Sequence, residues 1–209
     1  MELATSTKWE LALQPPTVEE LQKNIGDVFN VKWIKYMYAN FKNECPSGKM
    51  HFAAFKNLFS PHLPTGVSDE YIKRLFFAFS FGHCEVTFQA LLEALAMLRK
   101  SSAITQAKWT MRLISGSETK PVCYEEFLGF VRSIFVRKET ENRNLKKGSY
   151  KLEESLALNK VVERRARHIF ATLDRNEDGL IDTEELIEFF KGDGRINVQR
   201  LIGSGRTTC

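Results

Sequence analysis

Residues 174–185, which read DRNEDGLIDTEE, limit what this chain can fold into more than any other segment does. Oxygen-bearing side chains occur at alternate positions, from Asp174 through Asn176 to Asp178. This spacing lets a tightly coiled loop turn each of them towards one hard cation. Gly179, at the sixth position, permits the sharp bend that a side chain would obstruct. The segment therefore predicts a calcium-binding loop between two helices.

The rest of the segment completes the ligand set. Leu180 would contribute its backbone carbonyl, Asp182 would reach the ion directly or through water, and Glu185 would supply two oxygens. Asp182 is also expected to cap the exiting helix, with Glu185 three residues further on. This is the loop pattern of the EF-hand. The predicted ligands of one Ca²⁺ ion, or of Mg²⁺ in its absence, are Asp174, Asn176, Asp178, Leu180, Asp182 and Glu185.

Apolar walls flank this loop, as an EF-hand requires, at residues 169–173 before it and 186–190 after it. An acidic turn that binds nothing is the plainer alternative. A second loop should lie at residues 115–126, because the segment keeps an apolar eighth residue, Val122, and a terminal Glu126. It has no aspartate at the first, third or fifth position, and Lys120 replaces the glycine. We expect this loop to bind no calcium and to pair with the last loop through its eighth residue.

Two N-terminal segments have the same outline. One places Val86 at the eighth position but is one residue short and has no carboxylate where the ligands should begin. The other, residues 43–54, places Met50 at the eighth position but carries Cys45-Pro46 and ends in Ala54. Met50 and Val86 are expected to pair. The predicted fold is all-α, with two pairs of EF-hands, three of the four units degenerate, and short antiparallel bridges between paired loops.

Apolar residues recur at three- and four-residue spacing along most of the chain, and strand patterns are almost absent. Thr17 is expected to begin a helix as its N-cap, with Glu20 as its capping-box partner. The polar stretch after the third unit favours a linker. The expected organisation is a flexible tail (1–24), an N-terminal EF-hand pair (25–100), a C-terminal pair (101–194) with a linker (138–156), and a C-terminal tail (195–209).

Composition excludes several other classes. With 43% hydrophobic and 27% charged residues the chain is typical of a soluble globular protein, and a net charge of +4 supports no nucleic-acid partner. No run approaches a transmembrane segment, and Glu2 stands where N-myristoylation requires glycine. The four cysteines are widely spaced, which favours reduced thiols in a cytoplasmic protein; Cys84 and Cys123 are interpreted as buried small residues. No catalytic constellation is present, so we expect no enzyme.

The segment FKNECPSG at residues 41–48, with its disabled loop, resembles the neuronal calcium sensor family, and its potassium-channel-interacting branch most closely. Residues 168–193 are similar to the fourth EF-hand of that family. The resemblance covers residues 30–202. It is weaker in the middle, where the family's second and third loops usually bind calcium. The resemblance implies that the partner is a helix of a target protein, which would be a membrane guanylate cyclase, a potassium channel or a receptor kinase.

The leading hypothesis is a regulatory calcium-binding adaptor with one ion in its last loop. A groove in the N-terminal pair, whose many phenylalanines also serve the core, would hold an amphipathic helix of the target. The protein would be cytoplasmic, and its partner could hold it at a membrane surface. The alternative is a calcium-insensitive EF-hand scaffold with one structural ion. Three disabled loops favour the alternative, and the sequence leaves both open.

Overall fold

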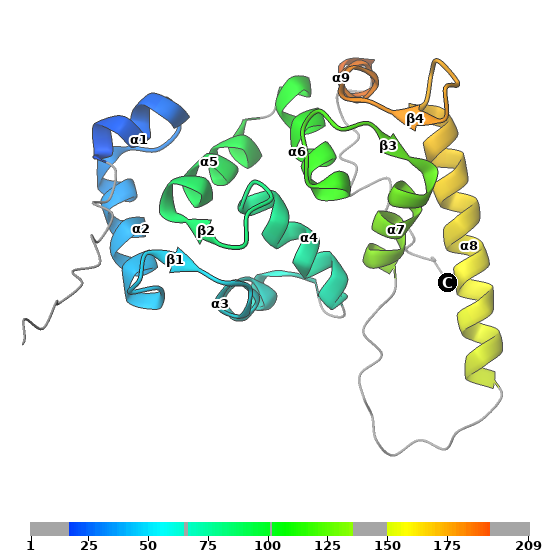
Figure 1. Cartoon of the computed structure of the whole chain (residues 1–209), viewed down its shortest axis with the longest axis horizontal. Helices are drawn as coiled ribbons and strands as arrows, with labels where there is room; N and C mark the ends of the chain where they lie inside the picture. The colour runs from blue at the N-terminus through cyan, green and yellow to red at the C-terminus, as the bar shows by residue number, and fades with distance from the viewer. Residues whose placement is uncertain (1–16, 65–66, 101, 136–149, 193–209) are drawn as a thin grey trace, which may run out of the picture.

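The computed structural model describes residues 17–64, 67–100, 102–135 and 150–192 (Figure 1). Its N-terminal part comprises α1 (Val18–Ile25), α2 (Val31–Glu44), β1 (Lys49–Met50), α3 (Phe52–Phe59), a short 3-10 helix (Ser60–His62), α4 (Asp69–Phe79), β2 (Val86–Thr87) and α5 (Phe88–Arg99). Its C-terminal part comprises α6 (Ala103–Ser115), β3 (Val122–Cys123), α7 (Tyr124–Phe135), α8 (Tyr150–Leu173), β4 (Leu180–Ile181) and α9 (Thr183–Gly192). The fold is all-α with short antiparallel bridges, as predicted.

Each bridge joins the eighth positions of two loops. Met50 faces Val86 in register, and Val122 faces Ile181. At most 1% of each of these four residues is exposed, so each bridge also anchors two loops in the core. Both predicted pairings are confirmed.

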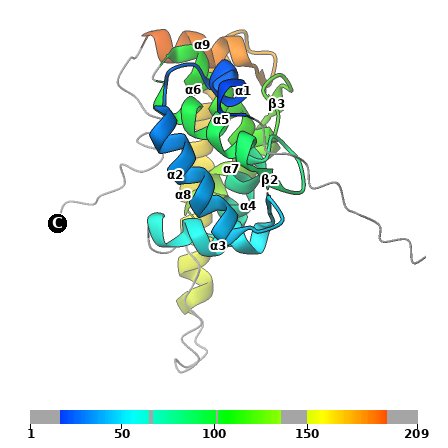
Figure 2. The ribbon, with the colours of Figure 1, turned by 90° about the vertical axis from the view of Figure 1, so that its left-hand side faces the viewer.

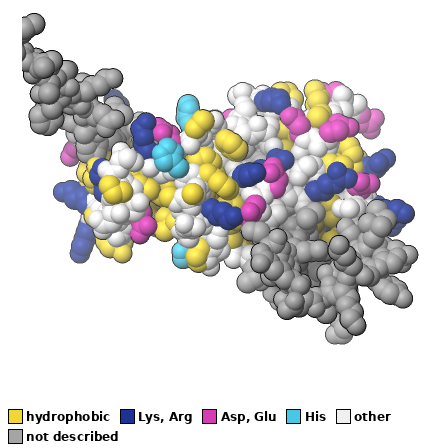
Figure 3. All heavy atoms as spheres, turned by 60° about the horizontal axis from the view of Figure 1, so that its bottom comes forward, with side chains coloured by type: hydrophobic (Ala, Val, Ile, Leu, Met, Phe, Trp, Pro, Cys, Tyr) yellow, Lys and Arg dark blue, Asp and Glu magenta, His cyan; other side chains and the backbone are white. Residues whose placement is uncertain are grey.

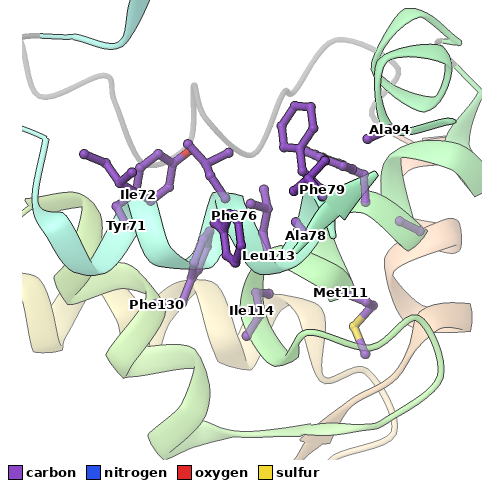
Figure 4. Packing of buried hydrophobic residues seen from close by; sticks show 14 of the residues in the cluster. Tyr71, Ile72, Phe76, Ala78, Phe79, Ala94, Met111, Leu113, Ile114 and Phe130 are labelled. Carbon is purple, nitrogen blue, oxygen red and sulfur yellow. The ribbon is translucent and has the colours of Figure 1, made fainter. Parts of the chain in front are cut away.

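The two halves of the molecule share one hydrophobic core. Helix α6 packs against both α4 and α5 of the N-terminal half, and α7 also packs against α4. The rings of Phe79 and Trp109 lie perpendicular to one another with centroids 5.3 Å apart, which joins α4 directly to α6. Figure 4 shows buried side chains of α4, α6 and α7 gathered in this region. The two pairs are therefore in direct mechanical contact.

Most of the N-terminal phenylalanines belong to that core. Phe55 is fully buried, and its ring contacts those of Phe59, Phe76 and Phe79 at centroid distances of 4.3, 5.4 and 5.5 Å. Phe77, by contrast, is 44% exposed. Only a minority of the aromatic surface is thus presented to solvent.

The prediction of a flexible tail through residue 24 is wrong from Val18 onwards. Thr17 Oγ1 accepts a hydrogen bond from the Glu20 N–H at 3.2 Å, and the Glu20 carboxylate accepts one from the Thr17 N–H at 2.8 Å. This is the predicted capping box, and it starts α1. Leu21 and Ile25 are 3% and 2% exposed, and α1 packs against α5. Burial of these two side chains holds the segment to the body.

The predicted linker is wrong at its C-terminal end, because residues 150–156 lie in α8. Figure 2 shows the beginning of this helix extending beyond the rest of the molecule. Two other predicted segments lie outside the described residues: the rest of the linker (138–149) and the C-terminal tail (195–209). Cys84 is exposed and Cys123 is half-buried, so neither has the full burial predicted for it. Within the described ranges, no helix is both long enough and apolar enough to cross a membrane.

Candidate metal centre

The last loop runs from the end of α8 to the start of α9. The Asp174 N–H still donates to the Phe170 carbonyl at 2.8 Å, so the first loop residue also closes the last turn of α8. Gly179 has φ +82°, and a Cβ there would meet nothing within 4 Å. Glycine is therefore required for its backbone conformation and not for space. Glu177 has a positive φ as well, +59°, which coils the loop twice within three residues.

The first three predicted ligand positions are organised by hydrogen bonds to the loop's own backbone. The two carboxylate oxygens of Asp174 accept from the N–H groups of Asp178 and Gly179 at 3.2 and 3.0 Å. Asn176 Oδ1 accepts from the Asp178 N–H at 2.9 Å, and the Asn176 amide donates to the Asp178 carboxylate at 3.0 Å. Asp178 in turn accepts from the Leu180 N–H at 2.8 Å. The alternating oxygens thus follow the turn of the coil.

The end of the loop contains a second capping box. Asp182 Oδ1 accepts from the Glu185 N–H at 2.8 Å, and Glu185 Oε2 accepts from the Asp182 N–H at 3.1 Å. The expected cap of α9 by Asp182 is confirmed. The other oxygen, Glu185 Oε1, accepts from the N–H groups of Arg175 and Asn176 at 2.9 and 3.3 Å. One carboxylate therefore ties the exiting helix to the start of the loop.

Among the described residues, no three His, Cys, Asp or Glu side chains converge closely enough to hold a metal ion. The carboxylates instead engage separate backbone N–H groups. The donor set nevertheless fits calcium, since it consists only of oxygens, and Asp174 and Glu185 are already folded inward, 9% and 8% exposed. The remaining predicted ligands, Asn176, Asp178, Leu180 and Asp182, lie on the exposed or half-buried side of the coil.

The charge balance of the last loop distinguishes it from the other three loops. Within the described part of the chain, no lysine or arginine forms an ion pair with its four predicted carboxylate ligands. Arg175, although inside the loop, pairs outward with Glu188 at 3.3 Å. Four carboxylates without a cationic partner, two of them buried, leave a concentration of negative charge that a divalent cation would neutralise.

Loop three, at residues 115–126, has the opposite charge balance. The Lys120 ammonium lies 2.5 Å from the carboxylate of Glu126, the residue that would be the terminal ligand. Glu118, in the middle of the loop, pairs with both Lys108 and Arg112. Burial tends to raise the pKa of Glu118, but the hydrogen bonds and charges of these two residues outweigh burial and lower it. Lysine and arginine side chains thus neutralise two acidic groups of this loop, Glu118 and Glu126.

Protein donors also close the other two loops. In loop one, at residues 43–54, the Lys42 ammonium donates to the carbonyl of Pro46. In loop two, which leads from α4 to β2, the Ser80 hydroxyl bonds to the carbonyl of His83 at 2.7 Å and to that of Phe77 at 3.3 Å. Sequence reasoning excluded all three loops for lack of ligands but missed these donors. Lys120, at the glycine position of loop three, was the only one of these donors that the sequence itself indicated.

Replacing Lys120 with glutamine should raise the pKa of Glu126. The hydrogen bond that Lys120 donates to Glu126 is the largest cause both of the lowered pKa of Glu126 and of the raised pKa of Lys120. The contribution of Glu126 to stability is present above its ordinary pKa of 4.5 and is lost as pH falls through the lowered value. Carboxyl-carbon NMR titration of Glu126 measures the change. Lys108→Gln is the control and should leave the pKa of Glu126 unchanged.

The chain matches none of the known protein-family models. It is similar to neuronal calcium sensor 1 of Lymnaea stagnalis, with 26% identity over 185 residues. These residues are 88% of this chain and 90% of the relative. The similarity therefore extends over both halves of the fold. It supports an EF-hand protein of the neuronal calcium sensor type.

Proposed function

We propose that this protein is a calcium-binding regulatory adaptor, and not an enzyme, that takes one Ca²⁺ ion in its last loop. The observation that carries the proposal is the set of four loop carboxylates without a lysine or arginine partner among the described residues. The other three loops are closed by the protein's own donors, Lys42, Ser80 and Lys120. The similarity to a protein named as a calcium sensor agrees with it.

The residues that would hold the ion are Asp174, Asn176, Asp178, Leu180 through its carbonyl, Asp182 and Glu185. A bound ion would supply the positive charge that these oxygens lack. Glu185 would be the lever, because its carboxylate already spans from α9 to the start of the loop. The next residue of α9, Leu186, is fully buried at 0% exposure. A change in the position of Glu185 would thus be transmitted to a helix that is fixed in the core.

The partner would be an amphipathic helix held by the N-terminal half. Figure 3 shows hydrophobic side chains gathered over the N-terminal half of the face it presents, with charged side chains more frequent towards the other end. Two large hydrophobic residues of the N-terminal pair, Leu58 of α3 and Phe77 of α4, are 38% and 44% exposed. The target classes implied by the family resemblance remain predictions, as does a cytoplasmic location.

A calcium-insensitive scaffold is the second candidate, and the closed loops favour it. Lys42, Ser80 and Lys120 hold their loops at any calcium concentration, so three of the four units have no ion to respond to. In this reading the last loop would hold a structural ion and the partner would be bound at all times. A site of the buffer type barely opens on binding calcium.

Calorimetric titration with calcium, combined with a dye that reports exposed apolar surface, separates the two. A regulatory adaptor should bind one ion in the sensor range of roughly 10⁻⁷ to 10⁻⁵ M and gain dye fluorescence as it does so. With a single site the response should be graded, without cooperativity between ions. One bound ion with no change in dye signal would select the scaffold. No heat of binding at all would refute a calcium function for this loop.

A further inference from the structure

A chain of direct contacts leads from the candidate calcium loop to loop three. The Thr183 hydroxyl, at the first residue of α9, donates to the backbone carbonyl of Glu118 at 2.5 Å. Thr183 is not one of the predicted ligands, but it stands between two of them, Asp182 and Glu185. The start of α9 is therefore fastened to the middle of loop three, in addition to the pairing of β3 with β4.

Loop three is fastened in turn to α6. The Glu118 carboxylate is hydrogen-bonded and ion-paired to the Arg112 guanidinium and lies 3.1 Å from the Lys108 ammonium. Arg112 is 7% exposed, although it carries a full charge. Its Nη1 has no hydrogen-bond partner within the described residues, so Glu118 is the acceptor that holds this guanidinium. A buried charge of this kind depends strongly on its one ion pair.

The same guanidinium lies over the ring of Phe81, 3.7 Å from the ring centroid. Phe81 belongs to loop two and has φ +56°, a left-handed conformation that is uncommon for a bulky residue. Gly82, the next residue, lies close to loop three, since a Cβ on it would be 3.7 Å from the Gly116 carbonyl. The cation–π contact therefore bridges the C-terminal half and the loop that forms β2 of the N-terminal half.

We propose that Arg112 is a coupling residue through which ion binding in the last loop changes the conformation of loop two. The path runs from Thr183 to Glu118, from Glu118 to Arg112 and from Arg112 to Phe81. Figure 1 shows α6, which carries Arg112, between α5 on one side and β3 and α9 on the other. This inference rests on the proposed function, because it requires calcium in the last loop. It adds a route by which one ion reaches the N-terminal half, where the target helix would bind.

The two hydrogen bonds on this path are suited to transmission because each is directional and partly buried. Because the planar guanidinium contacts both groups, a shift of the carboxylate would change its position over the ring. Arg74 makes a second link between the halves, from α4 to the Ile114 carbonyl at 2.6 Å, and its polar contacts within the described residues are with Ile114 and Glu70, not with the last loop. The proposal thus assigns the ion-dependent coupling to Arg112 and leaves Arg74 a structural link.

Hydrogen exchange at residues 80–87, with and without calcium, tests the path in the full chain. In the wild type, calcium should change the exchange of this segment. Thr183→Val removes the hydroxyl that donates to Glu118 while keeping the size of the side chain, and should remove most of that change. Thr183→Ser keeps the hydroxyl and should retain it. Lys49→Gln breaks the ion pair between β1 and Glu85 of loop two, which does not involve Arg112, and should also retain the change.

Calorimetry on the wild type, on Thr183→Val and on a further variant, Phe81→Leu, separates failure of this inference from failure of the proposed function. Allosteric coupling is reciprocal, so Phe81→Leu should shift the calcium dissociation constant, by about five-fold or more if the coupling is of ordinary strength. Wild-type protein that binds calcium, with equal exchange changes in wild type and Thr183→Val, would overturn the coupling alone. Wild-type protein that binds no calcium would overturn both proposals.

Discussion

Glu185→Gln is expected to abolish calcium binding. The substitution keeps the size of the side chain and one acceptor oxygen but removes the negative charge and the second ligating oxygen. Calcium at 100 times its dissociation constant should stabilise the wild type by about 2.7 kcal/mol, because only the folded state binds it. For a chain of this length that corresponds to an increase in melting temperature of about 5–11 °C. The variant should show no such increase.

The matched control is Glu184→Gln, which removes the same charge from the neighbouring residue of α9. Glu184 is exposed and is not a predicted ligand, so its variant should keep the calcium-dependent increase. Thermal unfolding with and without calcium measures both variants, and circular dichroism checks that α9 is retained. Full stabilisation of Glu185→Gln by calcium would show that the ion binds without the terminal ligand. That result would contradict the assignment of the site.

Phe55→Ala should destabilise the protein by about 3–5 kcal/mol, the usual cost of truncating a buried phenylalanine. Phe55 is 0% exposed, and its ring contacts three other phenylalanine rings in α3 and α4. Its loss would leave a cavity at the centre of the N-terminal half. Because the two halves share one core, we expect a single unfolding transition at lower denaturant concentration, measured without calcium.

Phe77→Ala is the control for this effect, since Phe77 is 44% exposed and makes a ring contact only with its neighbour Phe76 among the described aromatic pairs. Phe77→Ala should lower the free energy of unfolding by less than about 1 kcal/mol, as surface substitutions usually do. If Phe77 also lies in the partner's docking surface, its variant should weaken target binding while leaving stability nearly unchanged. Equal destabilisation by the two variants would mean that the exposed ring contributes as much as the buried one.

The pattern of the last loop could be predicted because its constraints are local. Alternating oxygens, one glycine and the terminal Glu185 lie within twelve consecutive residues, and each is required by the coil itself. The two bridges were predictable for a related reason. Apolar residues at the eighth positions, such as Val122 and Ile181, must be buried wherever two loops pair. Whether the oxygens bind an ion is a further question, which the proposed titrations address.

The boundaries of helices were less predictable where polar residues form a helix. Residues 150–156 have a composition typical of a linker but belong to the long helix α8. The segment before residue 25 was predicted as a tail although its capping box was recognised. What fixes α1 is the burial of Leu21 and Ile25 against α5, a contact between segments about 70 residues apart. Local composition carries no information about such a contact.

The sequence by itself determined the all-α fold, the pairing of the loops and the one loop with a complete set of oxygen positions. Only the tertiary structure decided which groups fill the other loops and how the loops are joined. Lys120 in loop three neutralises a residue six positions away, whereas Thr183, 65 residues from Glu118, reaches that residue's carbonyl only in the folded chain. Arg112 and Phe81 likewise meet only across the interface between the halves. Ligand spacing is encoded along the chain, but the partner of each charge depends on which distant segments the core brings together.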